Sequence, residues 1–213
     1  MVQFAFIIPS TSNKRDDWKS AEDSYLWSIL CSSLEKYTPD IGNRRIKLFI
    51  GFDEDDRIYS IEEERLKFSA VFMNFDIEFF PQPVETKGKV TTIWNNVGRE
   101  AIAQGYDYIK LLGDDIRMPS DRGWLGHFAN KLKKNNNIGF SAGFSNNDQI
   151  PTQFLVHRTH FEIFNFFYPE EIPSWGCDNF LHDVYPAKYR NCIIVAGVRG
   201  MRLHSQRSLL RLW

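Results

Sequence analysis

The sequence has few cysteines, which excludes a disulfide framework and a zinc site built on cysteine pairs. Three cysteines occur in 213 residues, Cys31, Cys177 and Cys192, and no two of them have the spacing of metal ligands. A sparse and odd count suits a reducing compartment, where disulfides rarely persist. We therefore expect a cytoplasmic protein.

Long hydrophobic runs are also missing. No stretch approaches the ~20 apolar residues that a membrane-spanning helix needs. The opening segment, MVQFAFIIPS, has no basic flank and too short an apolar region for a signal peptide. The formal net charge of −1 gives the whole molecule no general attraction to nucleic acid or to an anionic membrane. These absences predict a protein without a membrane span and without a nucleic-acid partner.

Charge is unevenly distributed along the chain. Residues 53–64 carry seven acids against one arginine, whereas residues 184–213 carry no acid at all. The bases of this last segment are Lys188, Arg190, Arg199, Arg202, Arg207 and Arg211. A basic segment in a neutral protein indicates an anionic ligand, although a solvated surface is the simpler explanation for any single one of these side chains.

Short apolar runs alternate with helical patterns over the first half of the chain. Hydrophobic residues make up 43% of the sequence and aromatic residues 15%, enough for the core of one domain. Strands are predicted at 4–8, 46–50, 77–80 and 108–112, and helices at 27–34, 60–73 and 90–101. Strands of this kind are usually buried on both faces. We expect an α/β fold with a mostly parallel central sheet flanked by helices.

The second half is less regular. Helices are predicted at 124–132 and 159–167, and strands at 139–142, 154–157, 193–196 and 199–203. We expect one domain over residues 1–213, with a Rossmann-like nucleotide-binding half at 1–115 and a mixed acceptor-side half at 116–213.

Polar residues follow three of the predicted strands where each one ends. Ligands bind beyond the carboxyl ends of the strands in open α/β sheets. Hydroxyls, carboxylates and bases should therefore converge on one edge of this sheet. The residues in question are Ser10, Thr11, Ser12, Asn13, Lys14 and Arg15 after the first strand, Asp53, Glu54, Asp55 and Asp56 after the second, and Asp114 and Asp115 after the fourth.

Asp114 and Asp115 stand next to each other at the end of a strand that reads as buried. Adjacent carboxylates repel each other unless a cation or a donor compensates. Mg²⁺ and Mn²⁺ commonly bind through one or two carboxylates together with substrate phosphates. We interpret the pair as a metal site that holds a diphosphate; the alternative is that it only starts a turn.

Three further residues are candidates on weaker signals. His204 follows the last predicted strand, and a neutral imidazole there could complete the shell of Mn²⁺. In the stretch PSWGCDN, Trp175 could be an apolar platform for a sugar ring, and Asp178 could act as a general base toward a hydroxyl. A structural role for Asp178 as the N-cap of a helix at 179–185 is the stronger reading of that stretch alone.

The order of these features resembles metal-dependent glycosyltransferases of the GT-A fold. That family usually has an Asn-x-Gly helix, a Gly-x-Tyr-Ile stretch and a strand that ends in an Asp-x-Asp-like motif, followed by a Trp-Gly-x-acid motif and a C-terminal metal-binding histidine. The chain has LLGDD, with Gly113 at the first acidic position, and WGCD. The matching residues before LLGDD are Asn96, Gly98, Ala101, Gly105, Tyr108 and Ile109. The whole chain is similar to viral domains of this kind, as encoded by chlorella viruses, which would place it in the host cytoplasm.

The resemblance implies a role for each candidate. Asp115 would bind Mn²⁺ or Mg²⁺ directly, His204 would be the second protein ligand, and Asp114 would contact ribose, sugar or a metal-bound water. Lys89 would reach a phosphate or the donor sugar, whereas Trp175 and Asp178 would lie on the acceptor side. The residues that would flank the uracil or ribose of a UDP-sugar are Pro9, Ser10, Thr11, Ser12 and Asp53. The acceptor would be a glycan or another hydroxyl compound, and inverting and retaining chemistry both stay open.

Three other functions compete with glycosyl transfer. A metal-dependent nucleotidyltransferase would carry a glycine-rich loop after the first strand, and PSTSNKR has no glycine. A phosphoaspartyl protein would use Asp53 as its nucleophile but leaves WGCD unexplained. A non-catalytic sugar-binding module would explain the many aromatic residues but rarely needs a parallel sheet covered on both faces.

Overall fold

The computed structural model describes residues 2–38, 45–143 and 150–193. Seven strands form one sheet in the order β3-β2-β1-β4-β6-β5-β7. The strands are β1 (Gln3–Pro9), β2 (Arg45–Asp53), β3 (Asp76–Gln82), β4 (Tyr108–Leu111), β5 (Phe140–Gly143), β6 (Leu155–His157) and β7 (Arg190–Ile193). The helices are α1 (Ser32–Tyr37), α2 (Glu62–Val71), α3 (Val90–Ala103), α4 (Trp124–Lys134), α5 (Thr159–Phe164) and α6 (Cys177–Val184). None of the described helices is both long and apolar enough to cross a membrane.

The first four strands are parallel, as predicted, and the second half is mixed. β1 pairs in parallel with β2 and β4, and β2 pairs in parallel with β3. β6 runs antiparallel to both β4 and β5, and β7 returns parallel to β5. The predicted fold class is thereby confirmed, while the division at residue 115 stays a prediction.

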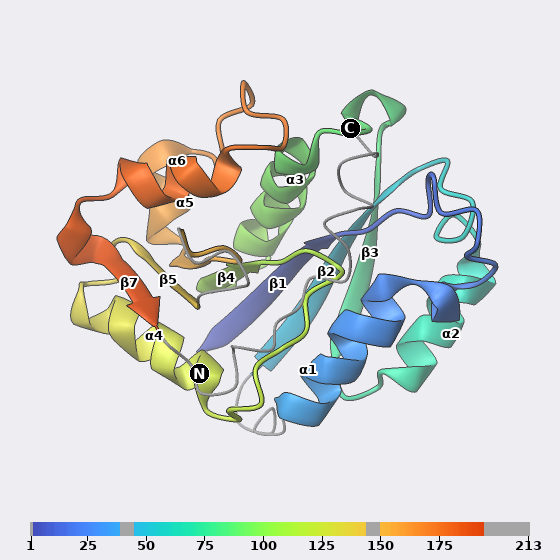
Figure 1. The fold of residues 1–213 in the computed structure, drawn as a ribbon, viewed down its shortest axis with the longest axis horizontal. Coiled ribbons are helices and arrows are strands. Elements are labelled where there is room, and N and C mark those ends of the chain that lie inside the picture. Colours follow the sequence, from blue (N-terminus) through green and yellow to red (C-terminus); the bar gives the residue numbers. More distant parts are fainter. Residues whose placement is uncertain (1, 39–44, 144–149, 194–213) are drawn as a thin grey trace.

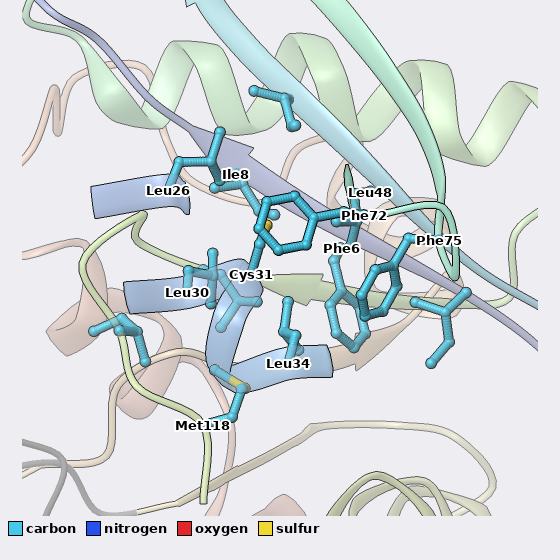
Figure 2. Packing of buried hydrophobic residues seen from close by; sticks show 14 of the residues in the cluster. Phe6, Ile8, Leu26, Leu30, Cys31, Leu34, Leu48, Phe72, Phe75 and Met118 are labelled. Carbon is cyan, nitrogen blue, oxygen red and sulfur yellow. The ribbon is translucent and has the colours of Figure 1, made fainter. Parts of the chain in front are cut away.

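Helices cover both faces of the sheet, because successive side chains of β1 point to opposite sides. Phe4, Phe6 and Ile8 belong to the cluster under α1, α2 and α4. Ala5 and Ile7 belong to the cluster under α3, α5 and α6, on the other face (Figure 1). Figure 2 shows part of the first cluster, in which Phe6 and Ile8 pack with side chains from the segment that leads into α1.

Several predicted boundaries were wrong for local reasons. β3 continues through Pro81 to Gln82, which an edge strand tolerates because one side of its backbone needs no partner. The helix predicted at 27–34 is a π-helical turn, Leu26–Cys31, followed by α1. The helix predicted at 159–167 ends at Phe164 because Asn165 adopts a left-handed conformation, with φ of 62°. Short helical turns lie at Ala21–Asp23, Val84–Thr86 and Ala187–Tyr189.

The C-terminal region was predicted to hold two strands at 193–196 and 199–203. β7 instead runs from Arg190 to Ile193, so it ends at the residue where the first of these strands was predicted to begin. Residues 194–203 lie outside the described part of the chain, together with His204 and most of the basic segment.

Candidate functional site

The carboxyl ends of β1, β2 and β4 meet at one edge of the sheet, as the sequence predicts. Pro9 stands opposite Gly51, and Ile7 stands opposite Leu111. Backbone bonds continue beyond the strands: Ser10 N donates to Gly51 O (2.9 Å) and Leu112 N donates to Ile7 O (3.0 Å). The loops that follow these strands are therefore held side by side.

Asp56 holds the loop after β1 against the loop after β2. Its carboxylate accepts hydrogen bonds from Thr11 Oγ1 (3.1 Å), Ser12 N (2.6 Å) and Ser12 Oγ (2.8 Å). It also accepts bonds from the backbone amides of Ile58 (2.9 Å) and Tyr59 (2.8 Å). Asp56 is fully buried. This residue carried no individual role in the sequence analysis, although an aspartate that precedes a helical turn is a common capping signal.

Asp53 lies beside this anchor and is also buried. Its Oδ2 accepts a hydrogen bond from Asn13 Nδ2 (2.7 Å) and lies 2.9 Å from Thr11 Oγ1, whose single proton is shared between Asp53 and Asp56. The structure thus brings Thr11, Ser12 and Asp53 together, three of the residues predicted to surround a nucleoside. On the rim of the same region, Lys87 Nζ pairs with Asp55 Oδ2 at 2.5 Å.

Ser10 connects the loop after β1 to the carboxylate pair after β4. Its hydroxyl lies 2.8 Å from Asp114 Oδ2 and 3.2 Å from the hydroxyl of Tyr59. A serine hydroxyl has one proton, and an ionised carboxylate can only accept. Tyr59 therefore donates to Ser10 when Ser10 donates to Asp114, and the three groups form one chain of hydrogen bonds.

The two carboxylates after β4 are half-buried and unfavourably placed for two negative charges. Burial, and then the charge of Asp115, raises the pKa of Asp114 to about 7, whereas the Ser10 hydrogen bond and the charge of Arg15 lower it. Burial also raises the pKa of Asp115, and its own backbone amide and the charge of Arg15 oppose this. Adjacent carboxylates with raised pKa values are typical of functional sites.

Arg15 supplies the positive charge that acts on both carboxylates. Its guanidinium lies over the rings of Tyr25 (4.7 Å to the centroid) and Trp18 (5.4 Å), which fix its direction. Arg57 donates to the carbonyls of Arg15 (2.8 Å) and Trp18 (2.6 Å), so the backbone of the loop is held as well. From the sequence, Arg15 was predicted only as one of the polar residues after the first strand.

The donor set at this edge fits a divalent cation that completes its shell with water and phosphate oxygens. Asp114 and Asp115 offer hard carboxylate oxygens, the ligand type that Mg²⁺ and Mn²⁺ prefer. Within the described ranges, no group of three or more His, Cys, Asp or Glu side chains is placed to hold a metal. His204, predicted as the second protein ligand, lies outside those ranges.

The acceptor-side candidates lie at the start of α6. The helix begins at Cys177, and its N-cap is Gly176, which has φ of 91°. The prediction that Asp178 caps a helix at 179–185 was therefore wrong, because Gly176 takes the left-handed cap conformation and leaves Asp178 inside the first turn. Trp175 is 68% exposed, and its role as an apolar platform for a sugar ring stays a prediction.

The segment before α6, at Phe167 and Tyr168, is held against α3 by hydrogen bonds to Asn95. Asn95 Oδ1 accepts bonds from Phe167 N (2.8 Å) and Tyr168 N (3.1 Å), and its Nδ2 donates to Tyr168 O (2.7 Å). A Cβ on Gly98 would lie 2.3 Å from Phe167 Cε2, so only glycine permits this approach. Asn96, the residue matched to the family pattern, instead donates to Gln82 Oε1 (3.1 Å).

The loop before Trp175 reaches the first turn of α3. Thr91 N donates to the carbonyl of Pro173 at 3.3 Å. Lys89, the exposed residue directly before α3, therefore shares this region with the Trp175 loop. The structure brings these two predicted contacts to the same side of the molecule.

Asp178 is half-buried, and burial alone raises its pKa to about 7. Among the described residues, no hydrogen bond or ion pair joins it to Asp114 or Asp115. A carboxyl group with a pKa near neutrality is suited to exchange a proton with a hydroxyl. The candidate residues thus fall into two groups, the carboxylate pair beside the β1 loop and Asp178 at the start of α6.

Comparison of the sequence with family models and with curated proteins finds no match. Comparison of the structure finds a cytidylyltransferase from Leptospira borgpetersenii serovar Hardjo-bovis, with a TM-score of 0.57 and 10% identity over 92% of this chain and 77% of that one. The fold is shared with nucleotide-sugar transferases. A mannosyltransferase from Pyrobaculum calidifontis, in complex with GDP-Man and Mn²⁺, has a TM-score of 0.56 and 10% identity over 92% of this chain.

The chain spans 55% of the length of that mannosyltransferase. A putative nucleotide-diphospho-sugar transferase from Desulfovibrio desulfuricans G20 is also similar, with a TM-score of 0.50 and 11% identity over 91% of this chain and 79% of that one. These likenesses establish the GT-A-like fold. The viral origin expected from the sequence resemblance stays a prediction.

Proposed function

We propose that this protein is a metal-dependent glycosyltransferase that moves a sugar from a nucleotide-diphosphate sugar to a hydroxyl acceptor. The observation that carries the proposal is the carboxylate pair, Asp114 and Asp115, joined through Ser10 to the loop after β1. A nucleotide sugar needs both parts, because one recognises the nucleoside and the other meets the diphosphate. The similarity of the fold to that of a mannosyltransferase and a nucleotide-diphospho-sugar transferase supports this assignment.

The donor lies, in this proposal, across the carboxyl ends of β1, β2 and β4. Ser10, Thr11, Ser12 and Asp53 surround the nucleoside, with Pro9 beneath them at the end of β1. Thr11 and Asn13 contact Oδ2 of Asp53, and in this proposal Oδ1 is the oxygen that accepts a hydrogen bond from the base or the ribose. UDP is the favoured nucleotide, as the family resemblance implies.

The diphosphate lies between Arg15 and the carboxylate pair, with Asp115 as the direct ligand of Mn²⁺ or Mg²⁺ and His204 as the second. A divalent cation stabilises the negative charge that develops on a leaving diphosphate. Arg15 supplies a second, fixed positive charge, because its guanidinium is held by two aromatic rings. Asp114, bonded to Ser10, contacts ribose, the sugar or a metal-bound water, and Lys89 reaches a phosphate or the sugar.

The acceptor lies near α6, where Trp175 offers an apolar face to a sugar ring. Asp178 accepts the proton of the acceptor hydroxyl when the sugar is transferred with inversion, and it positions the acceptor when the sugar is retained. Glycan acceptors fit the exposed indole best, because sugar rings present apolar C–H faces. We also propose a cytoplasmic location, which would be the host cytoplasm for a viral protein.

A second candidate is a metal-dependent nucleotidyltransferase that makes nucleotide sugars, and the similarity to a cytidylyltransferase favours it. Both enzymes bind a nucleotide at the same edge of the sheet. The loop after β1 contains no glycine, although its amides would have to approach a triphosphate closely in that reaction. We therefore rank glycosyl transfer first, and a non-catalytic sugar-binding role below both.

The test is release of UDP from a panel of UDP-sugars, with Mn²⁺, with Mg²⁺ and with chelator. Slow release that needs the metal and is lost in Asp115→Asn supports the proposal, with Asp121→Asn, an aspartate of the loop after the pair, as the matched control. Pyrophosphate release from a nucleoside triphosphate and a sugar phosphate would assign the second candidate. Binding of sugars without any turnover would leave only the binding module.

A further inference from the structure

Gln153 joins the segment before β6 to the turn that carries the carboxylate pair. Its side-chain oxygen Oε1 accepts a hydrogen bond of 2.7 Å from the backbone amide of Gly113. Its backbone carbonyl accepts a hydrogen bond from Nζ of Lys110. The next residue, Phe154, accepts a backbone bond from Leu111 N at 2.9 Å. Residues 110–113 are thus bonded to residues 153–154 at three points.

The backbone of Gln153 is held in an unfavourable conformation. Its φ of 57° lies in the left-handed region, which residues other than glycine and asparagine seldom adopt. Such a conformation persists only where surrounding contacts determine it. Here the side chain is bonded to Gly113, in the turn after β4, and the backbone carbonyl is bonded to Lys110, within the strand.

Lys110 is an unusual partner for this contact. It is 3% exposed, and its ammonium group lies 5.0 Å from the centroid of Phe128 and 5.7 Å from that of Trp124. Among the described residues, no carboxylate forms an ion pair with it. A buried amine needs a polar acceptor, and the carbonyl of Gln153 is the acceptor that the structure provides.

Gly113, which is bonded to Gln153, also packs against the side chain of Asp115. A Cβ built on Gly113 would lie 3.1 Å from Oδ1 of Asp115, closer than most real Cβ contacts. The Asp115 carboxylate therefore folds back over the Gly113 backbone, and a shift of that backbone would shift the carboxylate. This packing also gives a reason for glycine at the first acidic position of the family motif.

We propose that Gln153 and Lys110 are positioning residues for the metal-binding turn, which they act on through the Gly113 amide. The inference rests on the proposed function, because it assigns a purpose to the order of that turn. Gln153 bonds to the backbone of Gly113, at the position where the family motif has its first acidic side chain. Neither residue touches the donor in this scheme.

Gln153→Gly is the variant that isolates the contact. Glycine adopts a left-handed φ without strain, so the change removes Oε1 and leaves the backbone conformation favoured. We expect the fold to keep its stability, the dissociation constant for Mn²⁺ in the presence of UDP to rise about tenfold, as for the loss of one hydrogen bond, and the Gly113 amide to exchange faster with deuterium. Titration calorimetry and hydrogen exchange measure the two effects separately.

Asn165→Gly is the matched control, because Asn165 is an exposed residue with φ of 62° after α5. It should leave Mn²⁺ affinity and exchange at Gly113 unchanged. Lys110→Met provides a second route: it keeps an apolar stem of similar length and removes the donor to the Gln153 carbonyl. We expect it to weaken Mn²⁺ binding by about threefold, less than Gln153→Gly, because the Gly113 bond itself remains.

Three outcomes decide the matter. If the parent protein binds Mn²⁺ with UDP and Gln153→Gly binds it equally well, the positioning role is wrong while the proposed function stands. Faster exchange at Gly113 together with weaker Mn²⁺ binding, absent in Asn165→Gly, supports the role. If the parent protein binds no Mn²⁺ with UDP at all, the proposed function fails and the inference falls with it.

Discussion

The hydroxyl of Ser10 lies 2.8 Å from Oδ2 of Asp114, although 104 residues separate them in the sequence. This contact joins the loop after β1, which is proposed to bind a nucleoside, to the carboxylate pair proposed to bind a metal. A hydrogen bond to the ionised form of a carboxyl group lowers its pKa. Ser10 therefore favours the charged state of Asp114 against the burial that opposes it.

Ser10→Ala should weaken binding of Mn²⁺ and UDP and shift its pH dependence. Without the hydroxyl, the pKa of Asp114 rises above its value of about 7, so the carboxylate is protonated over a wider range of pH. We expect affinity at pH 7 to fall about tenfold, the loss expected for a hydrogen bond to a charged group, and the loss to shrink toward pH 9. Calorimetry between pH 6 and 9 measures this, and Ser28→Ala, at an exposed position of the π-helical turn Leu26–Cys31, is the control.

An equal loss at every pH would contradict this account, because the hydroxyl would then act through geometry and not through the ionisation of Asp114.

Asp56→Asn should destabilise the protein more than any exposed aspartate does. Asp56 accepts hydrogen bonds from three backbone amides and two hydroxyls, which bind both of its carboxylate oxygens. In asparagine one of these oxygens becomes an NH₂ group, which cannot accept a hydrogen bond. We expect the free energy of unfolding to fall by about 3 kcal/mol, since buried donors lose a charged acceptor. Urea denaturation measures the change.

Asp55→Asn is the matched control for this substitution. Asp55 is exposed and pairs with Lys87 on the surface, and such pairs contribute little to stability because solvent screens them. Equal effects of the two changes would show that Asp56 is not the anchor of these loops.

Lys110→Met should stabilise the protein, most strongly at low pH. Burial lowers the pKa of Lys110 to about 7, whereas the unfolded chain keeps the ordinary value of 10.5. Between these two values the folded state binds fewer protons than the unfolded state. The free energy of unfolding of the parent protein therefore rises as pH rises from 7 to 10.5. We expect the melting temperature of the variant to exceed that of the parent by several degrees at pH 6 and by little above pH 10.

Thermal unfolding at four or five pH values tests this prediction. A gain that does not depend on pH would mean that packing, and not the charge of Lys110, is responsible.

Asp178→Asn should reduce sugar transfer without weakening donor binding. Burial raises the pKa of Asp178 to about 7, so the parent rate should increase with pH through that value as the carboxylate becomes able to accept a proton. We expect the variant to lose about 10²-fold or more in turnover and to lose the rise near pH 7, with Mn²⁺–UDP affinity unchanged. Initial rates between pH 5.5 and 9 and calorimetry measure the two quantities.

Asp183→Asn, on the exposed side of the same helix, is the control for Asp178. A fall of only a few-fold in Asp178→Asn would favour retention, in which this carboxyl group positions the acceptor.

Local pattern decided the elements that depend on one segment. Alternating and continuous apolar residues predicted β1, β2, β3 and β4, since a strand that is covered on both faces must be apolar throughout. Apolar residues at helical spacing predicted α3 and α4, since one face of each helix is buried against the rest of the protein. The rule that ligands lie at the carboxyl ends of parallel strands then predicted that Ser10, Asp53 and Asp114 would come together. The structure confirms that these strand ends converge, since Ser10 is bonded to Asp114 and the neighbouring Thr11 to Asp53.

Long-range packing decided the rest. The sequence cannot show that Asp56 anchors two loops, that Asn95 and not Asn96 fixes the segment before α6, or that Gln153 bonds to Gly113, because each depends on partners 40 or more residues away. From its neighbours alone, Asp178 was predicted as an N-cap. The helix begins earlier, at Cys177, because Gly176 adopts the left-handed backbone of the cap. Local residue patterns thus specify a covered parallel sheet with carboxylates at its edge. Contacts between distant segments select the side chains that hold those carboxylates in place, because such partners cannot be read from neighbouring residues.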